Sequence, residues 1–100
     1  MNELPDGVKY DAEKLRYDLM PAHTLEQVVG VLTFGSKKYA DWNWKKVVAE
    51  NPDRYYAAAM RHIMARRKGE VNDSETGIDH YAHAICCLTF LMEAERDENI

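Results

Sequence analysis

The chain has 100 residues and a formal net charge of −4, and apolar residues make up 46% of it. One domain is expected at this length, and a chain this short buries only about 60–65% of its unfolded surface. The apolar fraction excludes an intrinsically disordered chain, and the negative charge argues against a nucleic acid or a membrane as partner.

The cysteines and the N-terminal residues both predict a cytoplasmic protein. Cys86 and Cys87 are adjacent within an apolar run, so we interpret them as reduced thiols of the core. Residues 1–6 lack the basic start and apolar stretch of a signal peptide. No apolar run reaches the roughly 18 residues of a membrane span.

Residues 1–23 are expected to form an extended arm. Pro5, Gly7 and Pro21 interrupt regular structure in this segment, which is also rich in charged side chains. Apolar residues such as Leu15 could anchor the arm against a core.

A first helix is expected to begin at Thr24. Thr24 and Gln27 have the spacing of a capping box, in which both side chains satisfy backbone N–H groups of the first turn. Apolar residues recur at helical spacing over residues 25–32. Residues 37–44 are polar and aromatic, and they predict a loop or an irregular turn.

The second helix has the clearest boundaries. Asn51 is a good N-cap, and Pro52 suits the first helical position because it lacks an N–H group. The helix is expected to end at Lys68, with Gly69 as the left-handed residue that follows it. Residues 70–76 then form a short acidic connection.

A third helix is expected over residues 77–96, with Thr76 or Ser74 as its cap. Its centre, residues 81–92, is apolar nearly all round, which indicates burial on several sides. In so small a chain this pattern favours a subunit interface. We therefore expect a homodimer or a higher homo-oligomer that forms through this helix.

These elements predict a single all-α domain over residues 1–100. It would be a small bundle of three main helices over residues 24–96, with the extended arm 1–23 and an acidic tail 97–100, completed by dimerisation. Short connections between long helices favour antiparallel neighbours.

A histidine-rich group on the second and third helices is the first candidate site. Asp79 and His83 are four residues apart, and His80 and His83 are three apart, so they share a helical face. An antiparallel second helix would bring His62 close to them. We place these four residues at the reactive centre, as metal ligands or as a general base. The alternative is that His83 is a hydrogen-bonded core residue and His80 a surface residue.

Acidic side chains near the same helix start are candidate ligands for Mg²⁺ or Mn²⁺, which bridge the oxygens of a triphosphate. The alternative is a solvated acidic loop. The candidate metal ligands, with one histidine included, are Glu70, Asp73, Glu75, Asp79 and His83.

Basic and aromatic side chains are candidates for holding phosphates and a base. Arginine donates two hydrogen bonds at once to phosphate, and an aromatic ring with an asparagine can stack on a base and bind its edge. The alternatives are a solvated basic surface and, for the tryptophans, anchoring in the core. The candidate substrate-binding residues are Lys9, Lys14, Arg16, Lys38, Tyr39, Asn43, Trp44, Arg54 and Arg61.

In their order and spacing, these residues resemble the phage and prophage domain named dATP/dGTP diphosphohydrolase, N-terminal. The resemblance extends from Gly7 to about Glu93. It rests on residues 7–11, Lys14, Arg16, Asp18, Leu19, Pro21, residues 34–39, Asn43, Trp44, residues 54–56, Arg61, His62, Gly69, Glu70, Asp73, Glu75, Gly77, His80, His83 and Ala84. It implies hydrolysis of a purine deoxynucleoside triphosphate to a monophosphate and pyrophosphate with Mg²⁺ or Mn²⁺, in the host cytoplasm.

The layout of the second half is also similar to the MazG-like all-α nucleotide pyrophosphohydrolases, but the metal-binding carboxylates differ. Those enzymes carry EExxE on one helix and ExxD on the next. In this chain Ala57, Ala58 and Arg61 align with the first set, and His80 and His83 align with the second.

Three hypotheses follow from the sequence. The chain is a metal-assisted pyrophosphohydrolase that uses a different ligand set. Alternatively, it binds or sequesters a nucleotide without cleaving it, because it lacks the glutamate cage. The third hypothesis is a helical structural or interaction protein whose histidines belong to the core.

Overall fold

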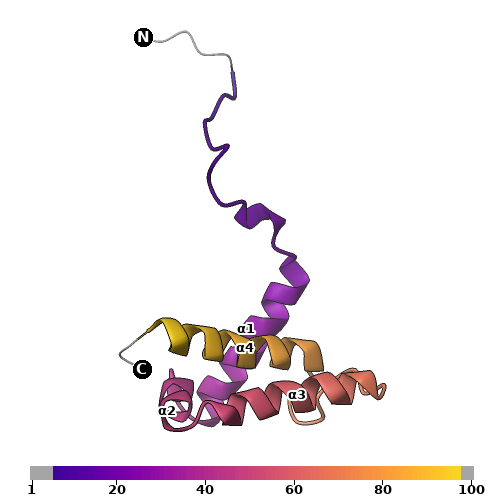
Figure 1. The fold of residues 1–100 in the computed structure, drawn as a ribbon. Coiled ribbons are helices and arrows are strands. Elements are labelled where there is room, and N and C mark those ends of the chain that lie inside the picture. The colour runs from indigo at the N-terminus through magenta and orange to yellow at the C-terminus, as the bar shows by residue number, and fades with distance from the viewer. Residues whose placement is uncertain (1–5, 98–100) are drawn as a thin grey trace.

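The computed structural model describes residues 6–97, which contain four α-helices and no β-strand. The helices are α1 (Ala22–Lys38), α2 (Asn43–Glu50), α3 (Asp53–Arg67) and α4 (His80–Arg96), and a 3₁₀ turn η1 (Tyr17–Leu19) precedes them (Figure 1). The prediction of an all-α fold is confirmed. The number of helices differs from the prediction, because four are present rather than three main ones.

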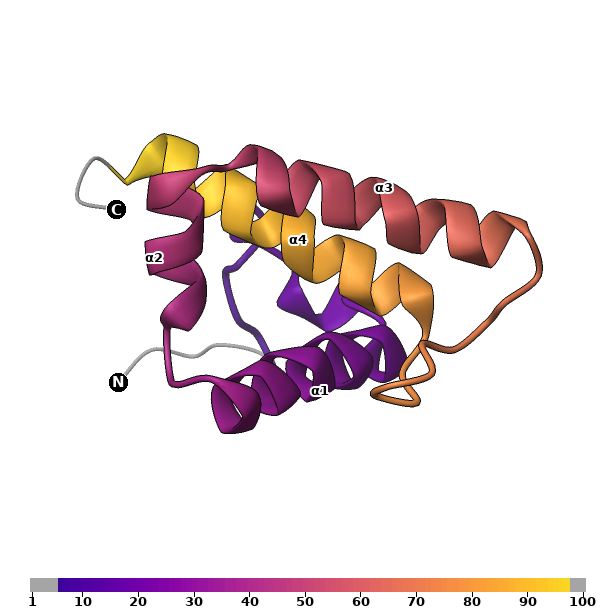
Figure 2. The same ribbon diagram turned by 90° about the horizontal axis from the view of Figure 1, so that it is seen from below.

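Helix α4 is the central element of the bundle. It lies beside α3 and is crossed by α1, and Figure 2 shows it between these two helices. Five of its residues are buried, namely His80, Ala82, Ala84, Cys86 and Cys87. Most of these side chains are small, so the neighbouring helices can approach closely.

Two contacts fix α1 against α4 and the loop before it. The Cys86 thiol donates to the carbonyl oxygen of Val28 at 3.4 Å. A Cβ atom at Gly30 would lie 3.2 Å from Cδ1 of Ile78, so a glycine permits this approach. Gly30 therefore lowers the intrinsic helix propensity of α1 but allows the helix to pack closely against Ile78.

Helix α1 begins earlier than predicted. Its first residue is Ala22 rather than Thr24, and no side chain caps it. The predicted capping box therefore does not form. The chain turns into the helix at Pro21 instead, whose fixed φ suits the position before a helix.

Helix α2 corrects the prediction of a loop over residues 37–44. Helix α1 continues to Lys38, and α2 begins at Asn43, so only four residues connect them. Trp42 makes the turn with a positive φ of 63°. A tryptophan in this left-handed conformation is uncommon. The Trp42 ring contacts the Lys45 ammonium, which lies 4.8 Å from the ring centroid.

The boundaries of α3 largely agree with the prediction. The Asn51 side-chain oxygen accepts from the Asp53 N–H at 3.1 Å, which confirms its capping role. Pro52 lies just before the first helical residue rather than on it. Gly69 follows the helix with a φ of +102°, as predicted for the residue after a C-cap.

Helix α4 begins at His80, three residues later than predicted. Gly77 has a left-handed backbone with a φ of +72°, which a right-handed helix cannot contain. The cap is Asp79 rather than Thr76 or Ser74, and its carboxylate accepts from the Tyr81 N–H at 2.8 Å. The loop before α4 is thus longer than expected, and it holds several candidate site residues.

The described part of the arm, residues 6–21, extends away from the helices as predicted (Figure 1). The radius of gyration is 18.2 Å, whereas a compact chain of this length has about 13 Å. Residues 1–5 of the arm and residues 98–100 of the predicted acidic tail lie outside the described residues. No helix among the described residues has the length and apolarity needed to span a membrane.

Candidate functional site

Three histidines from the antiparallel pair α3 and α4 lie together, as predicted. Nδ1 of His62 on α3 lies 2.8 Å from Nδ1 of His80 on α4. The rings of His62 and His83 are stacked, with centroids 4.5 Å apart and planes inclined by 13°. His80 is buried, while His62 and His83 are partly exposed.

The loop before α4 brings Asp73 to these histidines. Oδ1 of Asp73 accepts from the backbone N–H groups of Glu75 at 2.9 Å and Thr76 at 3.0 Å. The Thr76 hydroxyl lies 2.7 Å from Nε2 of His83 and accepts from the Ile78 N–H at 3.1 Å. Potential ligand atoms of His62, Asp73 and His80, one from each, all lie within 4.8 Å of one another.

The protonation of these groups favours a neutral imidazole pair beside an anionic carboxylate. Burial lowers the pKa of His62, and the nearby His83 and His80 rings lower it further. Burial also lowers the pKa of His83 and outweighs the opposing charge of Asp73. For Asp73, burial opposes ionisation, but the N–H groups of Thr76 and Glu75 prevail and lower its pKa. Near neutral pH the cluster can therefore accept a cation or a proton.

Asp79 is engaged elsewhere. Its carboxylate accepts two bonds from the Arg66 guanidinium at 3.1 and 3.3 Å, and it also caps α4. The Arg66 hydrogen bonds are the largest cause of the lowered pKa of Asp79. The structure thus gives this residue a structural role at the helix start, next to the histidine cluster in sequence.

The other predicted acidic ligands lie around the cluster. Oε2 of Glu70 is 3.4 Å from Nε2 of His80. This contact is longer than an ordinary hydrogen bond, and within residues 6–97 this buried nitrogen has no hydrogen-bond partner. Glu75 pairs with Lys38 at 2.8 Å instead.

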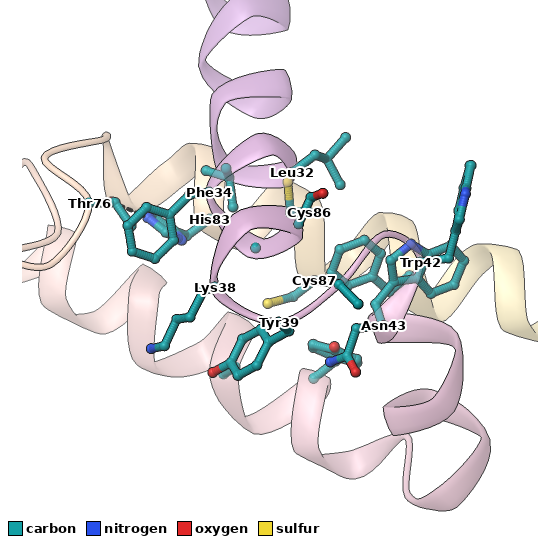
Figure 3. A pocket seen from close by; sticks show the side chains of 18 of the residues that line it. Leu32, Phe34, Lys38, Tyr39, Trp42, Asn43, Thr76, His83, Cys86 and Cys87 are labelled. Carbon is teal, nitrogen blue, oxygen red and sulfur yellow. Dashed lines mark hydrogen bonds between the residues drawn. The ribbon is translucent and has the colours of Figure 1, made fainter.

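A pocket of about 450 Å³ opens beside the histidines. Figure 3 shows Thr76 and His83 at one end and Trp42 at the other, with Phe34, Tyr39 and Asn43 between them. This volume lies within the range of about 300–1,000 Å³ that is typical of small-molecule sites. The pocket is lined by residues of all four helices and by the loop before α4.

Aromatic side chains form the wall away from the histidines. The rings of Trp44 and Phe90 are stacked at 4.7 Å, and Tyr55 meets Phe90 edge-on at 4.9 Å. Of the predicted substrate-binding residues, four line the pocket, namely Lys38, Tyr39, Asn43 and Trp44.

The remaining predicted substrate-binding residues lie outside the pocket lining. Lys9, Lys14 and Arg16 are on the exposed arm, where Arg16 pairs with Asp18 at 2.7 Å. Arg54 and Arg61 are exposed on α3. The positive charge of Arg61 nevertheless influences the site, because it acts to lower the pKa of His62 and of Cys87, which both line the pocket.

Some pocket residues were not predicted as site residues. Phe90 follows His83 by seven residues on α4, so the two share a helical face, and this spacing could have identified it. Thr76 was predicted only as a cap, and Tyr55 was not assigned a role in the site. No local signal places Thr76 beside His83, because the path of the loop between α3 and α4 decides that contact.

Comparisons with known proteins identify the family of the chain. The family described as dATP/dGTP diphosphohydrolase, N-terminal, matches residues 5–100. The chain is 35% identical over 85 residues to a protein of Salmonella phage PMBT28 named dATP/dGTP diphosphohydrolase. That match covers 85% of this chain and 28% of the phage protein, so the chain spans only part of its relative's length. No solved structure matches the chain. Because the family match extends over nearly all residues, the chain belongs to the dATP/dGTP diphosphohydrolase N-terminal family.

Proposed function

We propose that the pocket binds a purine deoxynucleoside triphosphate and that the triphosphate is cleaved at the histidine end, to a monophosphate and pyrophosphate. The observation that carries this proposal is the continuity of the pocket. One cavity of about 450 Å³ joins an aromatic wall to His62 and His83. The name of the phage relative supplies the substrate class, dATP and dGTP.

The aromatic wall suits a nucleobase. Tyr39 is exposed at the pocket, with the Lys38 ammonium 5.3 Å from its ring centroid on one face, so the other face is the one left for stacking. Trp44 is already stacked on Phe90. Asn43 offers both a donor and an acceptor to the edge of a base. A purine presents a large face for stacking and ring nitrogens for the amide.

Lys38 is the candidate phosphate ligand within the pocket lining. Its ammonium group pairs with Glu75 at 2.8 Å, and the hydrogen bond to Glu75 raises the pKa of the lysine. Both side chains are exposed, so the pair is weak and a triphosphate can displace the carboxylate. Once Glu75 is displaced, the Lys38 ammonium group can pair with the phosphate oxygens.

His83 is the candidate general base. It lines the pocket, and Thr76 holds its Nε2 at 2.7 Å. When Nε2 carries the proton and donates to Thr76, Nδ1 is free to accept one from water. The water oxygen then bonds to the α-phosphorus, the bond from that phosphorus to the bridging oxygen breaks, and pyrophosphate leaves.

The test is a product assay on the purified chain with a panel of dNTPs and NTPs, with Mg²⁺, with Mn²⁺ and without metal. We expect monophosphate and pyrophosphate in equal amounts, and a loss of about 10²-fold or more in His83→Gln. His23→Gln is the matched control, because His23 is exposed at the start of α1. Release of orthophosphate would refute this reaction.

A second candidate function is nucleotide binding without cleavage. It is favoured by Ala57 and Ala58 on α3, which align with metal-binding glutamates of the MazG-like enzymes that the second half of the chain resembles in layout. It predicts that a deoxynucleotide quenches tryptophan fluorescence and is recovered intact. Asn43→Ala and Lys38→Ala should weaken that binding, whereas Lys46→Ala, exposed on α2 and outside the pocket lining, should not.

A further inference from the structure

The metal-ligating atoms of the histidine cluster differ in kind from the carboxylate oxygens of the MazG-like enzymes. Mg²⁺ prefers six oxygen ligands in octahedral geometry. The three groups that converge here are two imidazoles and one carboxylate, from His62, His80 and Asp73. This set does not fit a magnesium cage, and imidazole nitrogen suits Zn²⁺ and neighbouring transition metals.

We propose that His62, Asp73 and His80 form a binding site for a divalent transition-metal ion of the Zn²⁺ type. The ligand atoms of these residues lie within 4.8 Å of one another. Around a tetrahedral ion with bonds of about 2.1 Å, neighbouring ligand atoms are about 3.4 Å apart. The two Nδ1 atoms are 2.8 Å apart, so a small ring movement makes room for an ion between them.

The second nitrogen of His80 supports this assignment. His80 is 5% exposed, and its Nε2 has no hydrogen-bond partner among the described residues. A histidine that binds a metal through Nδ1 must carry its proton on Nε2, and that proton usually goes to a carboxylate. Oε2 of Glu70 lies 3.4 Å from this nitrogen, on an exposed side chain that can move closer.

Two neighbouring carboxylates contact other groups in the structure, so we do not include them among the ligands of the metal ion. Asp79 is held by Arg66 and by the N-terminus of α4. Glu75 is paired with Lys38. Asp73 accepts two backbone N–H bonds at Oδ1, which orient the carboxylate and keep it ionised.

Three protein ligands leave a fourth position open, which is typical of catalytic zinc sites. His62 also lines the pocket, so the site borders it. A role of this metal in cleavage rests on the proposed function. The metal site itself does not, and it is therefore tested without nucleotide.

The experiment uses the full chain without a polyhistidine tag, stripped with a chelator and titrated with Co²⁺ and then with Zn²⁺. We expect one Co²⁺ ion to bind per chain and to give a visible absorption spectrum. Zn²⁺ should abolish this spectrum, whereas millimolar Mg²⁺ should not. His62→Gln and Asp73→Asn should each weaken binding at least tenfold. His23→Gln and Glu26→Gln, both exposed on α1, should leave metal binding unchanged.

Asp73→Asn is the most informative variant, because an asparagine oxygen can still accept the two backbone bonds of the loop. Circular dichroism of each variant then separates a lost ligand from a lost fold. The proposal would be overturned if the native chain bound no Co²⁺ or Zn²⁺, or if both ligand variants bound these ions as tightly as the native chain. It would also be overturned if Mg²⁺ displaced Co²⁺ as readily as Zn²⁺ does. If the chain binds the metal but does not turn over nucleotide, only the proposed cleavage is refuted. If it turns over nucleotide but binds no metal, only the metal site is refuted.

Discussion

At the scale of single residues, burial determines what the two cysteines can do. Cys86 and Cys87 lie on α4 beside the pocket, at 1% and 7% exposure. Burial raises the pKa of the Cys86 thiol to about 12 and that of Cys87 to about 11. Because only the thiolate is nucleophilic, neither side chain is suited to covalent catalysis near neutral pH.

These thiols should therefore resist alkylation in the folded protein. At pH 8 we expect iodoacetamide to modify them at least tenfold more slowly than glutathione under the same conditions. Addition of guanidinium chloride should restore rapid modification of both, because unfolding removes the burial that raises their pKa. Intact-mass spectrometry over time measures both rates. Modification of the folded chain at the rate of glutathione would show that the core opens readily.

Among the site residues, the histidines were more predictable than the partners they contact. Their spacing on α4 and the antiparallel α3 were sufficient to place His62 near His80 and His83. The sequence also suggested Asp79 for the same centre, because it shares a helical turn with His83. The structure pairs it with Arg66, thirteen residues earlier, which no local pattern indicates.

At the scale of elements, the start of α4 depends on a single aspartate. Asp79 accepts from the Tyr81 N–H and pairs with Arg66, so it links the first turn of α4 to the last turn of α3. Asp79→Ala should lower the free energy of unfolding by about 1 kcal/mol, the usual cost of losing an N-cap. Asp79→Asn should cost less, since asparagine also caps helices.

Urea denaturation monitored by circular dichroism measures these differences. Glu26→Ala is the control, because Glu26 is exposed on α1, and it should change stability by no more than about 0.5 kcal/mol. Equal stability of Asp79→Ala and the native chain would mean that the cap contributes nothing to α4.

The elements that sequence reasoning missed are those fixed by long-range contacts. Helix α2 has eight residues, too few for periodicity to reveal it, and it is held by packing against α3 and α4. The longer helices were predictable because their apolar residues repeat over several turns. The start of α4 was placed too early, since suitable caps occur at both Thr76 and Asp79, and only the left-handed Gly77 excludes the first.

At the scale of the whole molecule, the chain leaves much apolar surface uncovered. Only six apolar residues are buried among those described, and most are small. Large apolar side chains are exposed on the arm and on α1, α3 and α4. On α4 they form a stripe with spacings of four, three and four residues, the pattern of a helix that packs against another helix. The residues of this α4 stripe are Tyr81, Ile85, Leu88 and Met92.

We propose that this α4 stripe packs against a second copy of the chain, with the exposed side of α1 beside it. Leu25, Val29 and Leu32 recur on α1 at spacings of four and three residues, and all three are exposed. Leu32 lines a small pocket together with Thr89 and Phe90, so this part of α1 adjoins α4. A two-helix face of this kind is self-complementary when two copies meet about a two-fold axis.

The expected outcome is a homodimer at micromolar concentration, measured by sedimentation velocity over a hundredfold dilution. Leu88→Glu should shift the protein to monomer, because dimerisation would bury an unpaired charge at the centre of the α4 stripe. Lys46→Glu, exposed on α2 and therefore outside both helices of the proposed face, should leave the dimer intact. If the native chain sediments as a monomer throughout, its apolar surface must be covered by a different partner.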